Sequence, residues 1–367
     1  MLNDLKGQNI LYRDFVFIHN YARSLFLFFF FRREKTMQDV LFSIIVPFYN
    51  VENFIRDCCI SLKKQSFSNF EAIFIDDGSK DKSLEILKKE IGKDSRFKII
   101  YQLNQGQAVA RNNGLRNSIG KYILYLDSDD YLSDNLLETL YSVLNQNKYE
   151  VIQFNYNLVD LKGNFIKASS LQSVFNKLYG INLNKNSSFN INLIKRNCFV
   201  DLVPNCWTRC YSKEFLLKNN IEFPRTPFED SVFANKVLLK AKSIFYIDKS
   251  LYNYRTRDGS TMSSKSRKVL DVFKNVEIMR TFLEENKLID SFKRQLDNYE
   301  LFQVATAVAC LPCSSRKEFS EICRKKMSFR QYLSIRYLLF PKKSLLRFFS
   351  IFYWVYKLNK HKWKWNI

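Results

Sequence analysis

Apolar runs that end in acidic turns recur between residues 42 and 130 of this chain, and this pattern restricts the folds open to it. The stretch reads FSIIVPFYN (Phe42–Asn50), IFIDDGSKD (Ile73–Asp81), ARNNGL (Ala110–Leu115) and YILYLDSDD (Tyr122–Asp130). Continuous apolar runs with β-branched residues are typical of buried parallel strands. Open α/β sheets bind ligands at the carboxyl ends of such strands, so the clustered carboxylates predict a site there for a nucleotide and its metal.

Helices are expected between these strands. The patterns predict strands at Phe42–Val46, Ile73–Ile75, Phe97–Tyr101 and Tyr122–Leu126, and helices at Val51–Gln65, Asp81–Ile91, Gln107–Asn117 and Asp134–Leu144. Strands that alternate with helices of this length form βαβ units with right-handed crossovers. We therefore expect an α/β fold with a mostly parallel, twisted sheet flanked by helices.

The pattern loosens after Glu150. We expect a strand at Val151–Tyr156, a loop-rich insertion over Leu161–Ser188 and a helix at Asp230–Lys240. Beyond Lys265 the residues predict a helical, basic and aromatic extension. The chain then divides into an N-terminal arm (1–36), an α/β domain (37–262) with halves at 42–150 and 151–262, and a C-terminal region (263–367).

The turn Asp127-Ser128-Asp129 is a candidate metal site. Two carboxylates at positions i and i+2 of a turn can approach one divalent cation, Mn²⁺ or Mg²⁺, and leave coordination positions open for a diphosphate. The alternative is a helix cap and turn around Asp130 and Ser133. An EF-hand is excluded, because Leu132 stands where that loop needs a glycine.

Asp76 and Asp77 form the other acidic turn. A carboxylate here can accept the imide hydrogen of uracil or bind ribose hydroxyls, and Gly78 lets the backbone pass close to a nucleotide. The alternative is an ordinary turn. Pro47 and Tyr49 end the first strand, where Tyr49 can flank a uracil face, with packing in the core or at its rim as the alternative.

Arg111 is expected at the start of a helix beside both acidic turns. Its guanidinium can pair with a diphosphate or brace Asp77. A purely structural ion pair is the alternative interpretation.

Taken together, these motifs resemble the family 2 glycosyltransferases, which are inverting enzymes with a GT-A fold, over roughly Phe42 to Met262. The resemblance implies that Asp127 and Asp129 bind Mn²⁺ or Mg²⁺ with a nucleotide-sugar, and that Asp77 and Arg111 contact the nucleotide. Trp207 would line the acceptor pocket, and Arg255 would contact the phosphates.

The resemblance also implies an acidic pair that supplies a general base, and Glu229-Asp230 matches it. Asp230 would remove the proton of the acceptor hydroxyl. Capping of the helix that begins there is the alternative, and both roles are compatible. We therefore expect a hexosyl- or N-acetylhexosaminyltransferase that moves a sugar, in particular from a UDP-sugar, to a lipid-linked or surface polysaccharide acceptor, as in lipopolysaccharide or capsule synthesis.

Positive charge gathers at the end of the chain. The formal net charge is +22, and Leu311–Ile367 carries fourteen Lys or Arg against Glu318 and Glu321. Within it, Leu345–Tyr356 is apolar and aromatic but too short to span a bilayer, and it suits an interfacial helix on anionic lipid. A core helix with a solvated basic end is the alternative. We expect no nucleic-acid partner, because no motif of that class is present.

The expected location is the cytoplasm, on the inner face of the cytoplasmic membrane. Eight cysteines without a second C-x-x-C pair indicate free thiols in a reducing compartment. The apolar run Leu25–Phe31 is too short to span a membrane, and residues 1–36 form either a surface arm or sequence upstream of a start at Met37. The rival to an enzyme is a non-catalytic, membrane-peripheral interaction protein that retains the GT-A fold.

Overall fold

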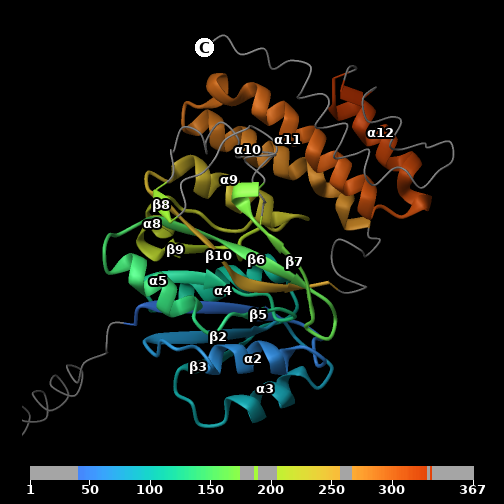
Figure 1. Cartoon of the computed structure of the whole chain (residues 1–367). Coiled ribbons are helices and arrows are strands. Elements are labelled where there is room, and N and C mark those ends of the chain that lie inside the picture. Colours follow the sequence, from blue (N-terminus) through green and yellow to red (C-terminus); the bar gives the residue numbers. More distant parts are fainter. Residues whose placement is uncertain (1–39, 174–185, 189–204, 257–266, 329–330, 333–367) are drawn as a thin grey trace, which may run out of the picture.

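The structure is a computed structural model that describes residues 40–173, 186–188, 205–256, 267–328 and 331–332. The expectations for the arm 1–36 and for the segment Leu345–Tyr356 lie outside the described residues. Within them the chain forms one mixed sheet with helices packed around it, and further helices lie beyond α9 at one end (Figure 1).

The first half of the sheet is parallel, as expected. Its strands run in the order β3-β2-β1-β4 and pair in parallel throughout. These strands are β1 (Phe42–Phe48), β2 (Phe70–Asp76), β3 (Phe97–Tyr101) and β4 (Tyr122–Tyr125). Every residue of β1, β2 and β4 is buried, which explains why their sequences are mostly apolar, with Ser43, Glu71 and Asp76 as the polar exceptions.

Helices cover both faces of this half. They are α2 (Ile55–Lys63), α3 (Ser83–Ile91), α4 (Gln107–Asn117) and α5 (Leu136–Leu144). On β2, Ile73 and Ile75 pack with Ala110 of α4. The intervening Phe74 belongs instead to the main core with Leu87 of α3. Alternate residues of one strand thus face opposite helical layers.

The second half of the sheet is mixed. The strand β9 (Arg209–Ser212) lies antiparallel between β4 and β6 (Val151–Val159). The long strand β10 (Ile244–Arg255) pairs in parallel with β6 and antiparallel with β5 (Tyr131–Leu132). Two further strands, β7 (Phe165–Ser169) and β8 (Ser187–Ser188), pair antiparallel with β6 and β10. The α/β fold is confirmed. Among the described strands, parallel pairing occurs within β3-β2-β1-β4 and between β6 and β10.

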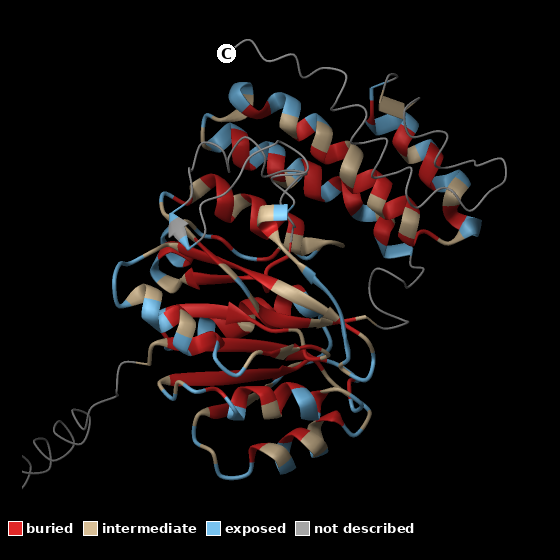
Figure 2. Ribbon diagram, viewed as in Figure 1, coloured by how far each residue is buried: buried red, intermediate tan, exposed pale blue. Residues whose placement is uncertain are grey.

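The C-terminal extension is helical through Lys326. It follows α8 (Lys213–Lys218) and α9 (Glu229–Lys240), and it contains η1 (Arg267–Val272), α10 (Phe273–Glu285), α11 (Ile289–Cys310), η2 (Cys313–Ser315) and α12 (Arg316–Lys326). The main core continues into it, because buried residues of α10 and α11 such as Met279 and Leu296 belong to the same cluster as the strands (Figure 2). Core contacts therefore cross the domain boundary expected at residue 262.

A second, smaller core lies farther along the extension. It joins η1, the end of α11 and α12 through buried side chains that include Val272, Val308 and Phe319. None of the described helices is both long enough and apolar enough to cross a membrane.

Candidate active site

The turns that follow β1 and β2 lie against each other and form one side of the site. Asp77 N donates to Phe48 O at 3.0 Å. Asn50 N donates to Ser79 Oγ at 3.2 Å, and Lys80 N donates to Asn50 Oδ1 at 2.8 Å. These bonds fix the two turns as one unit at the carboxyl edge of the sheet.

Tyr49 and Pro47 differ in what they offer to a ligand. Tyr49 is 44% exposed on this unit, whereas Pro47 is buried in β1 opposite Ile75. Tyr49 is thus available to flank a base, and Pro47 acts through the path of the strand. Their contacts with a nucleotide remain predictions.

Asp77 fixes the loop that leads into α4. Its carboxylate is buried and accepts hydrogen bonds from Gln102 Nε2 at 2.8 Å, Gln105 N at 2.9 Å and Gly106 N at 2.8 Å. The neighbouring Asp76 accepts from Ser79 N at 2.8 Å. Both carboxylates therefore shape the turn, and a contact of either with a base or ribose stays a prediction.

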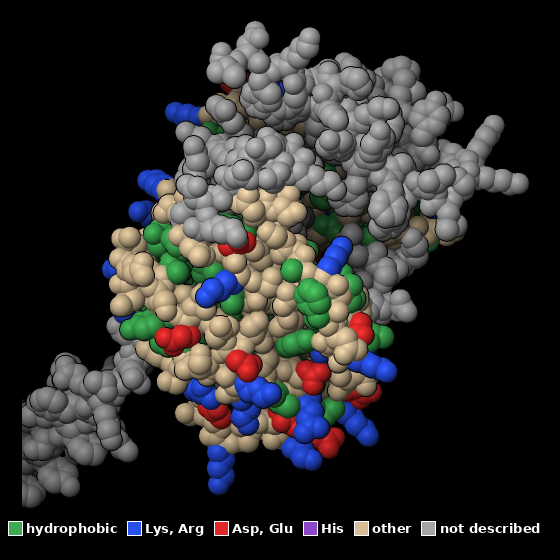
Figure 3. All heavy atoms as spheres, in the orientation of Figure 1, with side chains coloured by type: hydrophobic (Ala, Val, Ile, Leu, Met, Phe, Trp, Pro, Cys, Tyr) green, Lys and Arg blue, Asp and Glu red, His purple; other side chains and the backbone are tan. Residues whose placement is uncertain are grey.

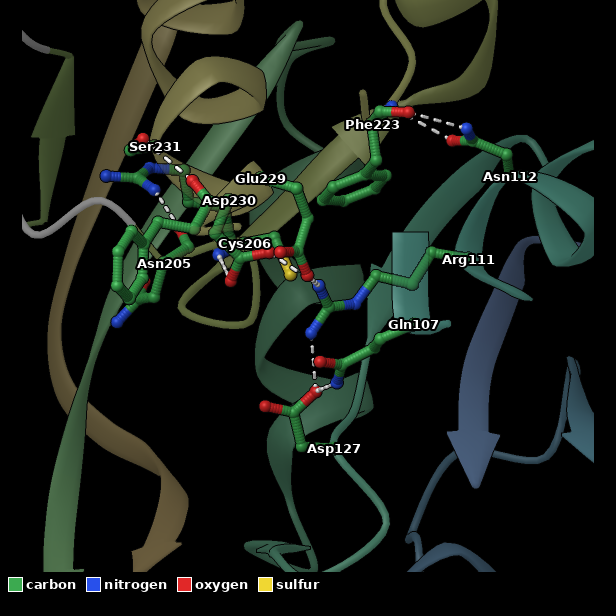
Figure 4. A network of polar contacts seen from close by, with 12 residues as sticks. Gln107, Arg111, Asn112, Asp127, Asn205, Cys206, Phe223, Glu229, Asp230 and Ser231 are labelled. Carbon is green, nitrogen blue, oxygen red and sulfur yellow. Dashed lines mark hydrogen bonds and ion pairs between the residues drawn. The ribbon is translucent and has the colours of Figure 1, made fainter. Parts of the chain in front are cut away.

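Arg111 joins the two acidic motifs of the sequence. Its buried guanidinium on α4 lies 2.8 Å from Asp127 Oδ1 through Nη2. Through Nη1 it lies 3.0 Å from Glu229 Oε1 and 2.5 Å from Asp230 Oδ1 (Figure 4). The hydrogen bonds of Arg111 run to Asp127, Glu229 and Asp230 rather than to Asp77. The structure therefore does not show the expected bracing of Asp77 by Arg111.

The close packing of α4 on β1 places Arg111. A Cβ on Gly114, one turn after Arg111, would lie 2.3 Å from Ile45 Cγ2, so only glycine permits this approach. Asn112 and Phe223 exchange two hydrogen bonds, at 2.8 and 2.9 Å. The Phe223 ring then lies 5.1 Å from the Arg111 guanidinium and covers it.

Negative charge exceeds positive charge in this cluster. Burial, together with the charges of Asp129 and Asp230, raises the pKa of Asp127 to about 6 against the opposing effect of Arg111. Burial and the charge of Asp230 raise the pKa of Glu229 to about 7, again against Arg111. One guanidinium thus faces more carboxylate charge than it balances, and a divalent cation would relieve the excess.

Asp130 anchors the Asp127 turn to β10. It accepts from Tyr252 OH at 2.6 Å and from Arg255 N at 2.8 Å, and Tyr252 OH accepts from Asp127 N at 3.2 Å. Burial, with the charges of Asp129 and Asp127, raises the pKa of Asp130 well above its ordinary value. The helix-cap alternative for Asp130 is therefore wrong, because its carboxylate binds a strand rather than α5.

Asp127 and Asp129 suit a hard cation, with Ser128 buried between them. The described residues contain no group of three or more His, Cys, Asp or Glu arranged to enclose a metal ion. Two carboxylates beside excess negative charge fit Mn²⁺ or Mg²⁺ if diphosphate oxygens and water complete the coordination.

Trp207 lies in a cluster of aromatic rings. Its ring centroid is 4.4 Å from that of Tyr252 and 5.2 Å from that of Tyr254, both stacked, and 4.9 Å from that of Tyr156. Trp207 is 8% exposed. Its indole therefore packs against the ring of Tyr252 and leaves little surface open to a ligand. Its contact with an acceptor stays a prediction.

Arg255 makes its contacts outside the Arg111 cluster. Its Nη2 lies 2.9 Å from Asp57 Oδ2, and its Nη1 donates to Leu161 O at 3.0 Å. The guanidinium also lies over the rings of Phe54 and Tyr131. It joins α2 to the turn before β7, and a contact with phosphates remains a prediction.

Three residues of the site were not singled out from the sequence. Gln107 Nε2 donates to Asp127 Oδ1 at 2.8 Å, and Cys206 N donates to Asp230 Oδ2 at 3.4 Å. The third is Tyr252, described above. For Gln107 the sequence carries a signal, because it lies four residues before Arg111 and shares its helix face.

Comparison with known proteins agrees with this geometry. Residues 43–209 match the sequence model of glycosyl transferase family 2. Glycosyltransferase GlyG of Streptococcus pneumoniae serotype 4 is 27% identical over 322 residues, which cover 79% of this chain and 96% of GlyG. Glycosyltransferase GlyA of the same organism is 33% identical over 220 residues, 59% of this chain and 31% of GlyA. The chain therefore spans about a third of GlyA and nearly all of GlyG.

Solved structures share the fold. S. aureus TarS 1–349 in complex with UDP-GlcNAc superposes with a TM-score of 0.54 at 22% identity, over 80% of this chain and 90% of that chain. The mannosyltransferase PcManGT from Pyrobaculum calidifontis, in complex with GDP-Man and Mn²⁺, gives a TM-score of 0.51 at 15% identity, over 95% and 97%. The fold is that of the GT-A glycosyltransferases. Residues 43–209 therefore form a domain of glycosyl transferase family 2.

Proposed function

We propose that this protein is an inverting glycosyltransferase that uses a nucleotide-sugar, in particular a UDP-sugar, as its donor. The observation that carries the proposal is the contact of Arg111 with Asp127, Glu229 and Asp230, at 2.8, 3.0 and 2.5 Å. One buried cation thereby couples the turn suited to a metal and diphosphate with the carboxylates suited to base catalysis.

Asp230 is the proposed general base. It accepts the proton of the acceptor hydroxyl while the hydroxyl oxygen forms a bond to the anomeric carbon of the sugar. The bond from that carbon to the diphosphate oxygen breaks on the opposite face, so the configuration inverts and the nucleoside diphosphate leaves. Arg111 orients Asp230 through the hydrogen bond from its Nη1 to Asp230 Oδ1 at 2.5 Å.

A divalent cation, Mn²⁺ or Mg²⁺, would be held by Asp127 and Asp129 and would supply positive charge next to the departing diphosphate. Among the structural relatives, PcManGT was solved with Mn²⁺ and GDP-Man and TarS with UDP-GlcNAc. These ligands support the proposal for this chain.

The proposed acceptor is a lipid-linked or surface polysaccharide, reached from the cytoplasmic face of the membrane. The basic, aromatic C-terminal sequence supports this location, because such segments bind anionic headgroups. The acidic cluster around Arg111 favours turnover over the rival role of a non-catalytic scaffold.

The test is an assay of the full chain with a panel of UDP-sugars and Mn²⁺, in which slow donor hydrolysis is measured first. Calorimetry of UDP binding then compares the parent with an Asp127→Asn and Asp129→Asn double variant. The double variant should lose the Mn²⁺-dependent part of binding and keep its fold, because Arg111 keeps its contacts with Glu229 and Asp230. Asp290→Asn, an exposed carboxylate on α11, is the control. Equal binding by all three proteins would refute the metal assignment.

A further inference from the structure

The backbone that leads into α9 is strained directly before the acidic pair. Phe228 precedes Glu229 and Asp230 and has φ 58° and ψ 38°, the left-handed region. Bulky residues rarely adopt this conformation, because it strains the backbone, and it persists only where the surroundings impose it. Something must therefore hold this turn in place.

Buried polar side chains from the helical extension hold it. Asn275 of α10 donates through Nδ2 to Pro227 O at 2.7 Å and to Gln303 Oε1 at 3.0 Å. Gln303 of α11 donates through Nε2 to Ser231 Oγ at 2.8 Å, and Ser231 Oγ donates to Phe228 O at 2.8 Å. These bonds enclose Glu229 and Asp230 from both sides along the chain.

The donors of this network can be assigned. Ser231 has a single hydroxyl hydrogen, which goes to Phe228 O, so its oxygen accepts from Gln303 and from Tyr299 OH at 2.8 Å. Asn275 is 0% exposed and Gln303 is 1% exposed, and within the described part of the chain Asn275 Oδ1 is the one side-chain oxygen of these two amides without a partner. A displacement of the turn would break several of these buried bonds at once, and each broken bond would leave a polar group without a partner.

The neighbours of these amides are apolar. Val276 and Met279 on α10 and Leu296 on α11 are buried and belong to the main core. Apolar side chains would pack these helices equally well, so the two amides serve a specific geometry rather than general stability.

We propose that Asn275 and Gln303 are positioning residues for the acidic pair, and that α10 and α11 are part of the catalytic unit. The two amides hydrogen-bond to neither Arg111 nor the carboxylates of the pair. They act through Pro227 O and through Ser231 Oγ, which in turn donates to Phe228 O. This inference rests on the proposed role of Asp230.

The test is Gln303→Met in the full chain, which keeps the length of the side chain and removes its hydrogen bonds. A small displacement of a catalytic group costs about 10- to 100-fold in rate, so kcat should fall by that factor while the donor KM stays within about 2-fold. Hydrogen exchange should become faster for the backbone amides of residues 229–231, of which Ser231 N donates to Phe228 O at 3.0 Å.

Two controls separate positioning from stability. Glu300→Gln alters a buried polar group that lies one turn before Gln303 on α11. The Glu300 carboxylate accepts from Gln331 Nε2 at 3.0 Å and is not part of the hydrogen bonds to α9. Val308→Ala removes buried volume from the second core. Both should leave kcat and the 229–231 amides unchanged, and Val308→Ala, which should lower the unfolding temperature, shows what a loss of stability alone does to the two readouts.

If Gln303→Met loses only thermal stability and keeps kcat, the proposal is overturned. If that variant does not fold, Ser231→Ala provides the second test, because it removes one oxygen from the same network and should produce the same split between kcat and KM. An inactive parent protein would refute the proposed function instead. In that case the exchange of the 229–231 amides still decides whether the extension holds the turn.

Discussion

At the scale of single residues, Arg111 decides the character of the site. A buried guanidinium is stable only when carboxylates surround it, and removal of one partner leaves charge uncompensated. Here the partners come from the turn after β4 and from the start of α9, which lie far apart in the sequence. The site is therefore assembled by the fold around one cation.

The base assignment is tested by Asp230→Asn. The amide keeps the shape of the side chain and removes its basicity, so turnover should fall by roughly 10²–10⁴-fold with little change in donor affinity. Initial rates with a saturating acceptor, together with calorimetric UDP binding, measure the two effects. Near-parental turnover would move the role of base to Glu229.

Glu71 is a structural residue that the sequence patterns did not single out. Its buried carboxylate accepts from Ser43 Oγ at 2.5 Å, Ile119 N at 2.6 Å and Lys98 Nζ at 2.7 Å. Burial acts to raise the pKa of Glu71, but the hydrogen bonds from Ile119, Lys98 and Ser43 outweigh it and leave the pKa below its ordinary value. The ionised form thus stabilises the pairing of β1, β2 and the turn before β4.

This shift predicts a pH dependence of stability. Because the pKa is lower in the folded state, the stabilisation is complete above the ordinary glutamate value and is lost as the pH falls through the folded-state value. Glu71→Gln should cost about 1–3 kcal/mol at pH 7 and show less loss between pH 5 and pH 3 than the parent. Urea unfolding across that range measures both. Parallel curves for the two proteins would contradict the argument.

At the scale of elements, the sequence predicted what depends on local pattern. The limits of α4 were predicted as observed, and α3 and α5 each begin two residues later than expected. The strand β10 was not predicted, because Asp248, Lys249 and the register shifts near Ser250 interrupt its apolar pattern. The insertion of antiparallel β9 between β4 and β6 follows from pairing across the chain, which local periodicity does not encode.

The same limit applies to the site. Asp127, Asp129 and Asp230 were chosen from motifs, and the structure places Asp127 and Asp230 on one guanidinium. The anchoring of Asp130 by Tyr252 was missed, because the two residues are far apart in sequence and no motif joins them.

The contact between α4 and β1 offers a test by a double-mutant cycle. Alanine normally stabilises a helix interior relative to glycine by about 1 kcal/mol. At Gly114 the sign should reverse, because the new Cβ would lie 2.3 Å from Ile45 Cγ2, and overpacking costs about 1–3 kcal/mol. Ile45→Ala removes that atom, so the double variant should be less destabilised than the sum of the single variants. Additive free energies of unfolding would show that the approach of α4 does not depend on Gly114.

At the scale of the whole molecule, charge is distributed unevenly along the chain. Of the formal net charge of +22, a net +12 falls in Leu311–Ile367. On the face shown in Figure 3, Lys and Arg side chains alternate with Asp and Glu side chains over the end that carries α2 and α3. The described part of this face is therefore mixed in charge. We propose that the excess charge of the C-terminal sequence serves contact with an anionic membrane.

The C-terminal segment gives the last prediction. If Leu345–Tyr356 lies in the membrane interface, each neighbouring lysine or arginine adds about 1 kcal/mol of attraction to anionic headgroups, which salt screens. Truncation after Pro341 leaves the described helices through α12 intact, so it should release the protein from anionic vesicles and spare activity on a soluble acceptor analogue. Co-sedimentation at rising salt measures the release, with neutral vesicles as the control. Insoluble truncated protein, together with binding by the full chain that ignores lipid charge, would show instead that the segment packs in the core.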